Sequence, residues 1–442
     1  MINKIRFGAL SKLAWPITCG MMANNLLILI DTAMVSRLGP VSMAGVAMAS
    51  VVGTLTFTMV MGLSGAVQAI TARRAGEGET TQVSSGLHAG LLLGLVIGSL
   101  VAVIMIFVAP AIFGTFNLET AARDLATSYF RVVALSIPAI GANSCFRGFF
   151  NGIAKTKVYM TSLLLTVSIN IFLNWVFIYG NLGAPRLDAV GAGVASAIAL
   201  YCSSLFYCIF AFRYGRPFGF ASQRPSSETI RAVLRLSIPA SMHQFLGCLV
   251  TMVFFAIIST LGTHELAAST VVFRLTLVVA LPAFGFAIAG ATMVGHTLGK
   301  KEPERAKLWG WDALKMGSFT MALLGLPMWL MPRFILGFFI TDDPTTLDFA
   351  VVPMIVSGAS LVVNGCRNIF IQLLNGAGDQ KFVLKATQSY HWFVGTPLIA
   401  LVALVFAWGL NAIWFCYAIN YILVSVILML RWNSGKWAAR KV

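Results

Sequence analysis

The feature that most constrains this sequence is a series of apolar stretches, each eighteen or more residues long, that recur from Leu10 to Leu430. An α-helix rises about 1.5 Å per residue, so each stretch can cross a hydrocarbon core about 30 Å thick. Continuous apolar stretches also exclude the alternating pattern of a membrane barrel. We therefore predict an all-α integral membrane protein with 12 transmembrane helices. The predicted spans lie near residues 10–35, 43–70, 86–110, 122–147, 158–181, 190–212, 234–258, 266–294, 310–335, 350–374, 383–408 and 411–431.

The composition agrees with this prediction and indicates how the chain is oriented. Only 10% of the 442 residues are charged, too few to cover a soluble globule of this length. The net charge is +16, and most Lys and Arg residues fall in alternate connections between spans. This asymmetry predicts that both termini are cytoplasmic. It explains the basic excess by topology and by contact with anionic membrane lipid, so we expect no nucleic-acid partner.

An internal repeat divides the chain into two halves. Leu13-Ala14-Trp15-Pro16 in the first span matches Leu236-Ser237-Ile238-Pro239 in the seventh span, 223 residues later. Two six-span bundles of this kind are related by an axis along the membrane normal, an architecture typical of transporters. We predict an N-terminal lobe over 1–212, a basic cytoplasmic linker over 213–235, and a C-terminal lobe over 236–442.

Asp31 is the one acidic residue that sits inside a long apolar stretch. A carboxylate in hydrocarbon costs roughly 2.5–3.5 kcal/mol on insertion scales, so such a residue is a candidate for function. Its counterpart 223 residues later is Phe254, which restricts the buried acid to the first half of the chain. Because shared folding cannot explain this difference between the halves, Asp31 is the leading candidate site.

Three asparagines lie at spacings that suit contact with such an acid. Asn24 precedes Asp31 by two helical turns, and Asn170 and Asn174 share one face of the fifth span. Plain helix packing is an alternative explanation for these amides. The alternative for Asp31 is a structural ion pair with an intramembrane arginine. The candidates for that pair are Arg131 and Arg274, whereas Arg147 and Arg367 are interpreted as snorkelling anchors near span ends.

The pattern of Pro16, Asp31 and the following Thr32-Ala33-Met34-Val35-Ser36-Arg37-Leu38-Gly39 resembles the multidrug and toxic compound extrusion (MATE) family. The sequence from Leu261 to Ala268, which opens the eighth span, resembles the same family. So do the fifth and sixth spans, with Asn170 to Gly180 and Gly191 to Ser196. The resemblance covers essentially the whole chain and is closest to the NorM-like and DinF-like bacterial type.

The resemblance implies roles for individual residues of this chain. Asp31 matches the first-span carboxylate that couples cation movement to transport, and Pro16 matches the first-span kink proline. Asn170 and Asn174 match a polar pair of the fifth span, and Ser196 takes the place of a threonine that lines the same cavity.

Two positions depart from the family pattern, and both lie in the second half. A seventh-span glutamate of NorM-like members is replaced by Gly247, and a tenth-span aspartate is replaced by Asn364, which we still expect to line the cavity. The second half therefore lacks the acids of a sodium site. This absence favours proton coupling through Asp31.

We accordingly expect a secondary antiporter that exports amphipathic, mainly cationic organic compounds in exchange for H+, or less favourably Na+. The resemblance places it as a multi-pass monomer in the bacterial cytoplasmic (inner) membrane, with small-molecule drugs and membrane lipid as its contacts. We expect no enzymatic activity, no cofactor and no metal site, because the seven cysteines occur singly and no catalytic constellation is present.

Two alternative functions fit the sequence less well. An ATP-driven pump needs a phosphate-binding GxxxxGK[ST] loop, which the sequence lacks. A flippase for polyprenyl-linked saccharides, from the same superfamily, has a similar number of spans. Its pyrophosphate substrate favours a cavity lined by arginine and lysine, whereas the best-placed charge here is the Asp31 carboxylate.

Overall fold

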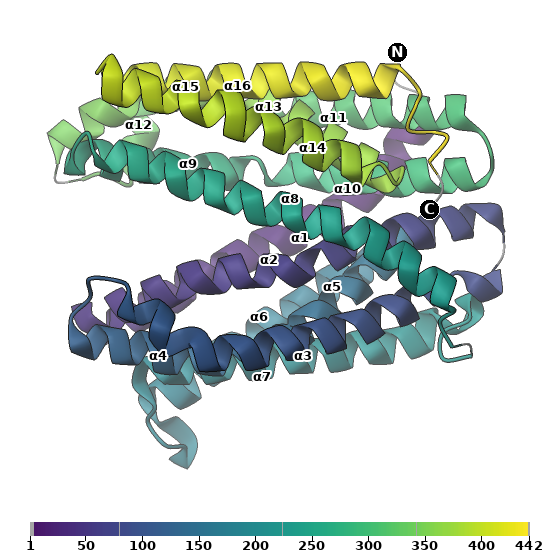
Figure 1. Ribbon diagram of the computed structural model, residues 1–442, viewed down its shortest axis with the longest axis horizontal. Helices are drawn as coiled ribbons and strands as arrows, with labels where there is room; N and C mark the ends of the chain where they lie inside the picture. Colours follow the sequence, from purple (N-terminus) through teal and green to yellow (C-terminus); the bar gives the residue numbers. More distant parts are fainter. Residues whose placement is uncertain (1–3, 79, 223, 342, 441–442) are drawn as a thin grey trace. The chain divides into compact units, whose positions relative to one another are not determined.

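The computed structural model describes residues 4–78, 80–222, 224–341 and 343–440, and these are almost entirely helical. Figure 1 labels the helices in chain order. The first half contains α1 (Lys4–Ser36), α2 (Pro40–Glu77), α3 (Ser85–Gly114), α4 (Thr120–Ala134), α5 (Ile137–Gly152), α6 (Thr156–Tyr179) and α7 (Asp188–Tyr214). The second half contains α8 (Ser227–Ser259), α9 (Thr263–Val279), α10 (Leu281–Gly299), α11 (Pro303–Leu330), α12 (Pro332–Gly337), α13 (Pro344–Gly376), α14 (Gln380–Tyr390), α15 (Thr396–Ala400) and α16 (Gly409–Asn433).

The helices have the length and composition of membrane spans. Within the described ranges, eleven are long and apolar enough to cross a membrane, and the number rises to twelve when the bent pair α4 and α5 counts as one span. The predicted all-helical membrane fold is therefore confirmed. The cytoplasmic position of the termini stays a prediction.

Three of the predicted spans, 122–147, 266–294 and 310–335, are interrupted in the structure. The first is divided into α4 and α5, which meet at 46°. The second is divided into α9 and α10, and the third into α11 and α12, with a single residue between the two helices in each case. Pro138, Pro282 and Pro332 lie in the first turn of α5, α10 and α12 respectively. Proline lacks a backbone N–H and is tolerated in the first turn of a helix, where that donor has no partner, so a new helix begins at each interruption.

The described residues form two compact units, and the division falls inside helices. One unit, here called the N-terminal unit, runs from Cys19 to Met242. The other, the C-terminal unit, joins the start of the chain up to Thr18 with the chain from His243 onward. The boundaries thus lie within α1 and α8, and not in the basic linker at which the sequence analysis divides the lobes.

A proline precedes each boundary by two or three residues. Pro16 lies inside α1 and Pro239 inside α8, yet both helices are continuous. Because proline cannot donate a backbone hydrogen bond, the backbone hydrogen bonding of each helix is weakened at its proline. The kink predicted at Pro16 stays a prediction.

Matching glycine contacts hold the first part of α1 and of α8 in their units. In the N-terminal unit, Gly62 of α2 donates its N–H to Ser241 Oγ at 3.2 Å, and that hydroxyl donates to Met59 O at 2.9 Å. In the C-terminal unit, Gly285 of α10 lies against Thr18 of α1. A Cβ on either glycine would overlap the facing hydroxyl oxygen. Gly285 lies 223 residues after Gly62, and Ser241 lies 223 residues after Thr18. The same contact therefore occurs once in each unit.

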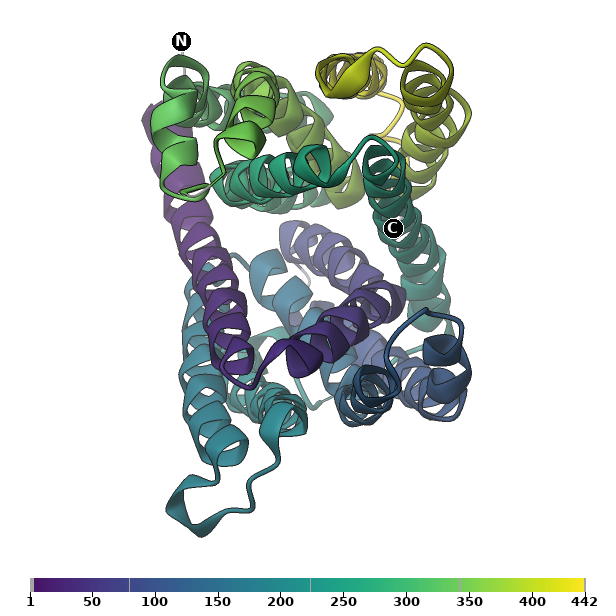
Figure 2. The same cartoon turned by 90° about the vertical axis from the view of Figure 1, so that its left-hand side faces the viewer.

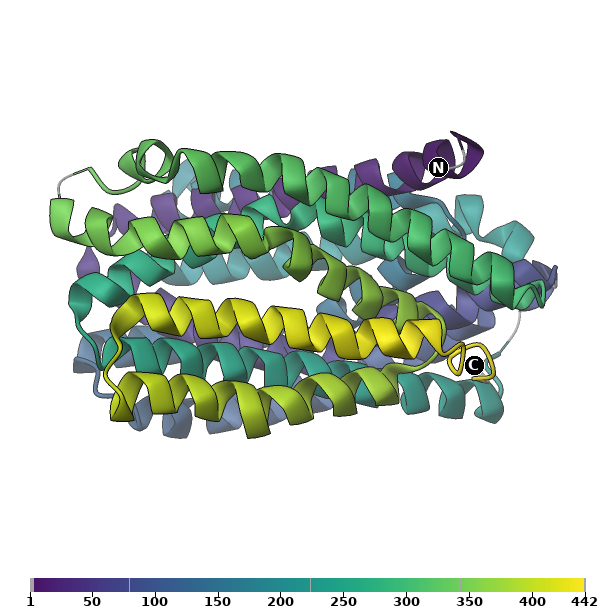
Figure 3. The same ribbon diagram turned by 90° about the horizontal axis from the view of Figure 1, so that it is seen from above.

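Neighbouring helices within each unit pack along their length. In the N-terminal unit, α6 and α7 are in contact and are joined by a short segment that contains η2 (Asn181–Gly183) (Figure 2). In the C-terminal unit, α16 contacts α13 and α14, and Figure 3 shows α14 and α16 side by side. These contacts bury the apolar core of each unit.

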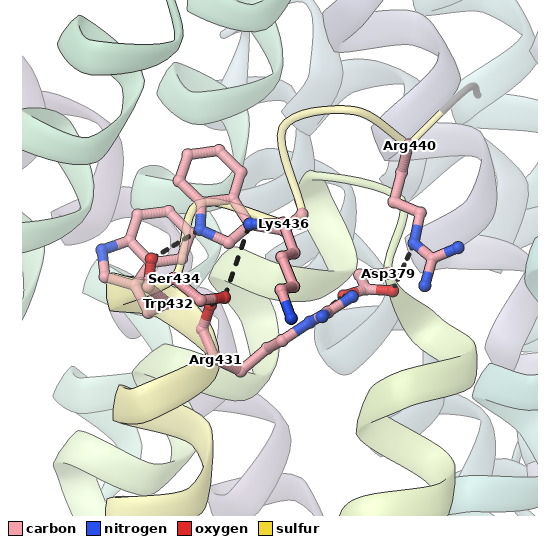
Figure 4. Close-up of polar contacts among 7 residues, drawn as sticks. Asp379, Arg431, Trp432, Ser434, Lys436 and Arg440 are labelled. Atoms are coloured by element: carbon pink, nitrogen blue, oxygen red, sulfur yellow. Dashed lines mark hydrogen bonds and ion pairs between the residues drawn. The ribbon is translucent and has the colours of Figure 1, made fainter.

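A polar cluster closes the end of the C-terminal unit at which α16 finishes. Asp379, in the connection between α13 and α14, pairs with Arg431 at 2.7 Å and with Arg440 at 3.0 Å (Figure 4). The indole rings of Trp432 and Trp437 stack beside it, with centroids 4.1 Å apart. The chain after α16 is thereby folded back onto the unit.

Candidate ion-coupling site

The candidate site lies within the N-terminal unit, where α1, α6 and α7 contribute one polar cluster. Asn174 of α6 donates from Nδ2 to Asp31 Oδ1 of α1 at 2.5 Å and to Asn170 Oδ1 at 2.9 Å. Asn170 in turn donates from Nδ2 to Ser196 Oγ of α7 at 3.1 Å. The four side chains form a continuous chain of hydrogen bonds from Ser196 to Asp31.

The two asparagines position this chain from the interior of the unit. Their side chains lie one helical turn apart on α6, and the exposed fractions of Asn170 and Asn174 are 2% and 0%. Both Nδ2 hydrogens of Asn174 are used, one for the Asp31 carboxylate and one for Asn170. A buried polar network of this kind fixes the orientation of its members, because an unpaired polar group in this environment is costly.

The sequence analysis did not identify two tyrosines near this cluster. Tyr129 of α4 is close enough to Asp31 for their charges to interact, and the Tyr179 hydroxyl donates to Met34 O of α1 at 3.3 Å. Both are aromatic residues in largely apolar surroundings. Their sequence positions carry no signal that distinguishes them from ordinary core residues.

The structure gives the carboxylate an amide partner instead of the arginine considered as an alternative. Arg131 donates from Nε to Ile106 O at 3.1 Å and is exposed. Within the described part of the N-terminal unit, no ion pair involves Asp31. Arg274 lies on an exposed face of α9, in the other unit.

Three predicted site residues are not part of this cluster. Asn24 is exposed, and no hydrogen bond within the described N-terminal unit involves its side chain. Pro16 and Asn364 belong to the C-terminal unit. The structure therefore brings together Asp31 and the residues predicted on α6 and α7.

In the C-terminal unit, the repeat counterpart of Asp31 and the position of the family's tenth-span aspartate carry uncharged side chains. Phe254, the counterpart of Asp31, is 2% exposed and stacks on Tyr417 with ring centroids 4.6 Å apart. Asn364 Oδ1 accepts from Arg367 Nη2 at 3.1 Å and from Asn368 Nδ2 at 3.2 Å. Over the described ranges, no group of three or more His, Cys, Asp or Glu side chains is arranged to hold a metal ion.

Comparison with known proteins identifies the family. The MatE family model matches residues 16–176 and 239–401, about three quarters of the chain. The chain belongs to the MatE family. The matched segments begin at Pro16 and Pro239, 223 residues apart, as the internal repeat requires. The resemblance inferred from the sequence is confirmed, and it places the protein in a family of transporters.

Individual relatives extend the match to almost the full length. The chain is 26% identical to Multidrug resistance protein NorM of Aliivibrio fischeri over 88% of this chain and 85% of the relative. It is also 26% identical to Probable multidrug resistance protein NorM of Rhodopseudomonas palustris, over 95% and 90%.

Solved MatE structures share the fold. An outward-facing multidrug resistance MATE family transporter of the MOP superfamily aligns with a TM-score of 0.89 at 21% identity, over 97% of this chain and 96% of the other. A MOP superfamily transporter from Pyrococcus furiosus, described as having a binding pocket of reverse polarity, aligns with a TM-score of 0.88 at 20% identity, over 98% and 96%.

Proposed function

We propose that the protein is a multidrug exporter that exchanges amphipathic, mainly cationic organic compounds for protons, with Asp31 as the coupling carboxylate. The observation that carries the proposal is the Asp31 carboxylate held by Asn174 at 2.5 Å, with no arginine partner in its described unit. A carboxylate kept free of a permanent counter-ion can exchange one positive charge for another. The names of the NorM relatives support multiple drugs as the cargo. Our proposal includes antibiotics and other xenobiotics among them.

The hydrogen bonds suggest how protonation acts on the cluster. As an anion, Asp31 accepts a hydrogen bond from Asn174 Nδ2 and attracts a cationic compound. A proton taken up on a carboxylate oxygen removes the negative charge and converts an acceptor into a donor. The contact with Asn174 then weakens, and the effect reaches Asn170 and Ser196 through their shared bonds. Binding of the cation and binding of the proton are thus alternative states of the Asp31 carboxylate.

The same geometry supports protons over sodium as the coupling ion. Sodium, like other hard cations, prefers oxygen ligands, but Asn174 turns its amide nitrogen toward the Asp31 carboxylate. A sodium site here would require that amide to rotate and to give up both of its donated bonds. Proton exchange requires only a change at the carboxylate itself.

The test is transport by the purified protein in proteoliposomes, with a fluorescent organic cation as cargo. We expect an imposed pH gradient without sodium to drive export, and Asp31→Asn to abolish cargo-induced proton movement. Asp188→Asn is the matched control, because Asp188 is an exposed carboxylate paired with Arg186 at 2.8 Å, outside the cluster. Undiminished exchange in Asp31→Asn would remove Asp31 from the mechanism. Transport driven only by a sodium gradient at uniform pH would overturn proton coupling.

Other parts of the proposal follow from the family. A bacterial cytoplasmic membrane location and a monomeric state are proposed with the exporter function. A flippase for polyprenyl-linked saccharides is the alternative function, and the NorM relatives favour the exporter over it. Movement of a fluorescent polyprenyl-linked sugar across the same proteoliposomes, without export of the organic cation, would establish the flippase instead.

A further inference from the structure

The interior of the C-terminal unit contains a second polar cluster, centred on Arg367 of α13. Arg367 Nη2 donates to Asn364 Oδ1 at 3.1 Å and to Asn368 Oδ1 at 3.2 Å. Its guanidinium lies over the ring of Tyr421 of α16, 4.8 Å from the centroid. The sequence analysis interpreted Arg367 as a snorkelling anchor. The structure instead directs its charge onto amides and an aromatic ring of the same unit.

The Arg367 cation has no carboxylate partner among the described residues of this unit. The ion pairs there join other residues, namely Asp312 with Arg6, Asp343 with His264, Asp348 with Arg333, Glu302 with Arg305, and Asp379 with Arg431 and Arg440. Arg367 Nε is buried and makes no hydrogen bond within the described unit. Arg367 as a whole is partly buried, and a positive charge withdrawn from water without a counter-charge is destabilised.

The other titratable groups around Arg367 cannot supply the negative charge. His243 of α8 and His391, which follows α14, both interact electrostatically with Arg367. The phenol side chains of Tyr417 and Tyr421 of α16 also interact electrostatically with Arg367. Each of these side chains is neutral or cationic near neutral pH. The cluster is therefore cationic overall.

A small cavity adjoins this cluster. Its polar lining residues include Asn364, Ser357, Ser360, Tyr417 and Tyr421, the rest of the lining is mostly apolar, and its volume is about 10 Å³. That volume suits one particle of roughly the size of a water molecule. The Ser357 hydroxyl is buried and has no hydrogen-bond partner among the described residues, so this hydroxyl and the Asn364 amide can donate hydrogen bonds to an anion. A second cavity of similar size shares Tyr417 and reaches His391 and Asn420.

The repeat shows that this charge is special to the second half. The counterpart of Arg367 is Asn143, 224 residues earlier, whose amide donates to Leu200 O at 3.0 Å and accepts from Ser204 Oγ at 2.8 Å. The acid at Asp31 likewise has an uncharged counterpart, Phe254. Asp31 and Arg367 thus each occur in one half of the chain only, at positions that the repeat does not relate.

We propose that the pocket beside Arg367 binds a small monovalent anion, either chloride or the carboxylate group of an organic solute. The anion supplies the missing counter-charge from the cavity, because Asn364 and Tyr421 line the cavity and also contact Arg367. The Ser357 hydroxyl and the Asn364 amide are its hydrogen-bond donors. The size of the cavity favours the halide. This proposal is independent of the role of Asp31, because it concerns binding in the other unit.

Equilibrium dialysis of the purified full-length protein with radioactive chloride tests the proposal, with sulfate holding the ionic strength constant. We expect saturable chloride binding that weakens about tenfold or more in Arg367→Gln, because the positive charge beside the cavity is lost. Arg274→Gln is the matched control, since Arg274 is an exposed arginine of α9 in the same unit, and its binding should match wild type. Competition by benzoate identifies a carboxylate as an occupant of the same site.

A second variant keeps the arginine and supplies the counter-charge from the chain itself. In Asn364→Asp the new carboxylate replaces an amide oxygen 3.1 Å from Arg367 Nη2, with nearly the same shape. An internal ion pair then forms, and chloride binding should fall as far as in Arg367→Gln. Benzoate binding that chloride does not displace, but that both variants lose, supports the site with a carboxylate as its occupant. Binding of neither anion, binding retained in both variants, or loss in Arg274→Gln alone overturns the proposal.

Discussion

Replacement of Asp379 by asparagine tests how the end of the C-terminal unit is held together. The Asp379 side chain is 1% exposed, and each of its oxygens meets a different arginine. Arg431 approaches Oδ2 with Nη2 at 2.7 Å and with Nε at 2.8 Å, a two-pronged contact, and its side chain is 12% exposed. Arg440 approaches Oδ1 with one nitrogen at 3.0 Å and is 53% exposed.

The expected loss of stability follows from these exposures. Removal of one partner from a buried pair costs about 3–5 kcal/mol, because the remaining charge is left without compensation. A half-exposed pair contributes only about 0.2–1 kcal/mol, since water screens it. We therefore expect Asp379→Asn to lower the free energy of unfolding by about 3 kcal/mol, near the lower end of the buried range. Arg431→Gln should cost nearly as much and Arg440→Gln less than about 1 kcal/mol.

Denaturant-induced unfolding of the purified protein in detergent measures these changes, and tryptophan fluorescence reports on the same region. Trp432 and Trp437 are 0% and 1% exposed and stack within the folded-back end of the chain. A double-mutant cycle between Asp379 and each arginine isolates the two interaction energies. The reasoning is refuted if Arg440→Gln is as destabilising as Arg431→Gln, or if Asp379→Asn costs less than about 1 kcal/mol.

Two further predictions concern other parts of the chain. Gly62→Ala and Gly285→Ala should each lower the melting temperature and cost about 1–3 kcal/mol of folding stability, because the added methyl group overlaps the Ser241 or Thr18 hydroxyl. Gly65→Ala is the control, since the space around its Cβ position is open. Equal stability of all three variants would contradict the contact. Asp343 caps α13, and hydrogen bonds from the Thr346 hydroxyl and N–H, with a smaller contribution from His264, lower its pKa to about 2. Its folded-state pKa is below the ordinary value of 3.8, so its stabilising effect is present above about pH 4 and is lost as the pH falls toward 2. Carboxyl titration by NMR should give this low midpoint in wild type and a higher one in Thr346→Val, and an unshifted wild-type midpoint would disprove the cap effect.

The sequence determined the fold class, the repeat and the family of this protein. Apolar stretches long enough to cross a membrane leave the chain no alternative to helices, because lipid cannot satisfy free backbone groups. A buried acid is costly, so Asp31 was recognisable from its neighbours in the sequence alone. The spacing of Asn170 and Asn174 predicted a shared helix face, and the structure places both beside Ser196 and Asp31.

Only the tertiary structure decided which groups meet. Hydropathy shows that a helix is buried in a membrane but not which helix faces it, and so it could not distinguish an amide from an arginine as the partner of Asp31. For the same reason the interruptions before Pro138 and Pro282, and the division of the units inside α1 and α8, lay beyond sequence reasoning. Arg367 is the clearest example: from the sequence its long side chain could reach water, and only packing against Asn364, Asn368 and Tyr421 retains its charge within the unit.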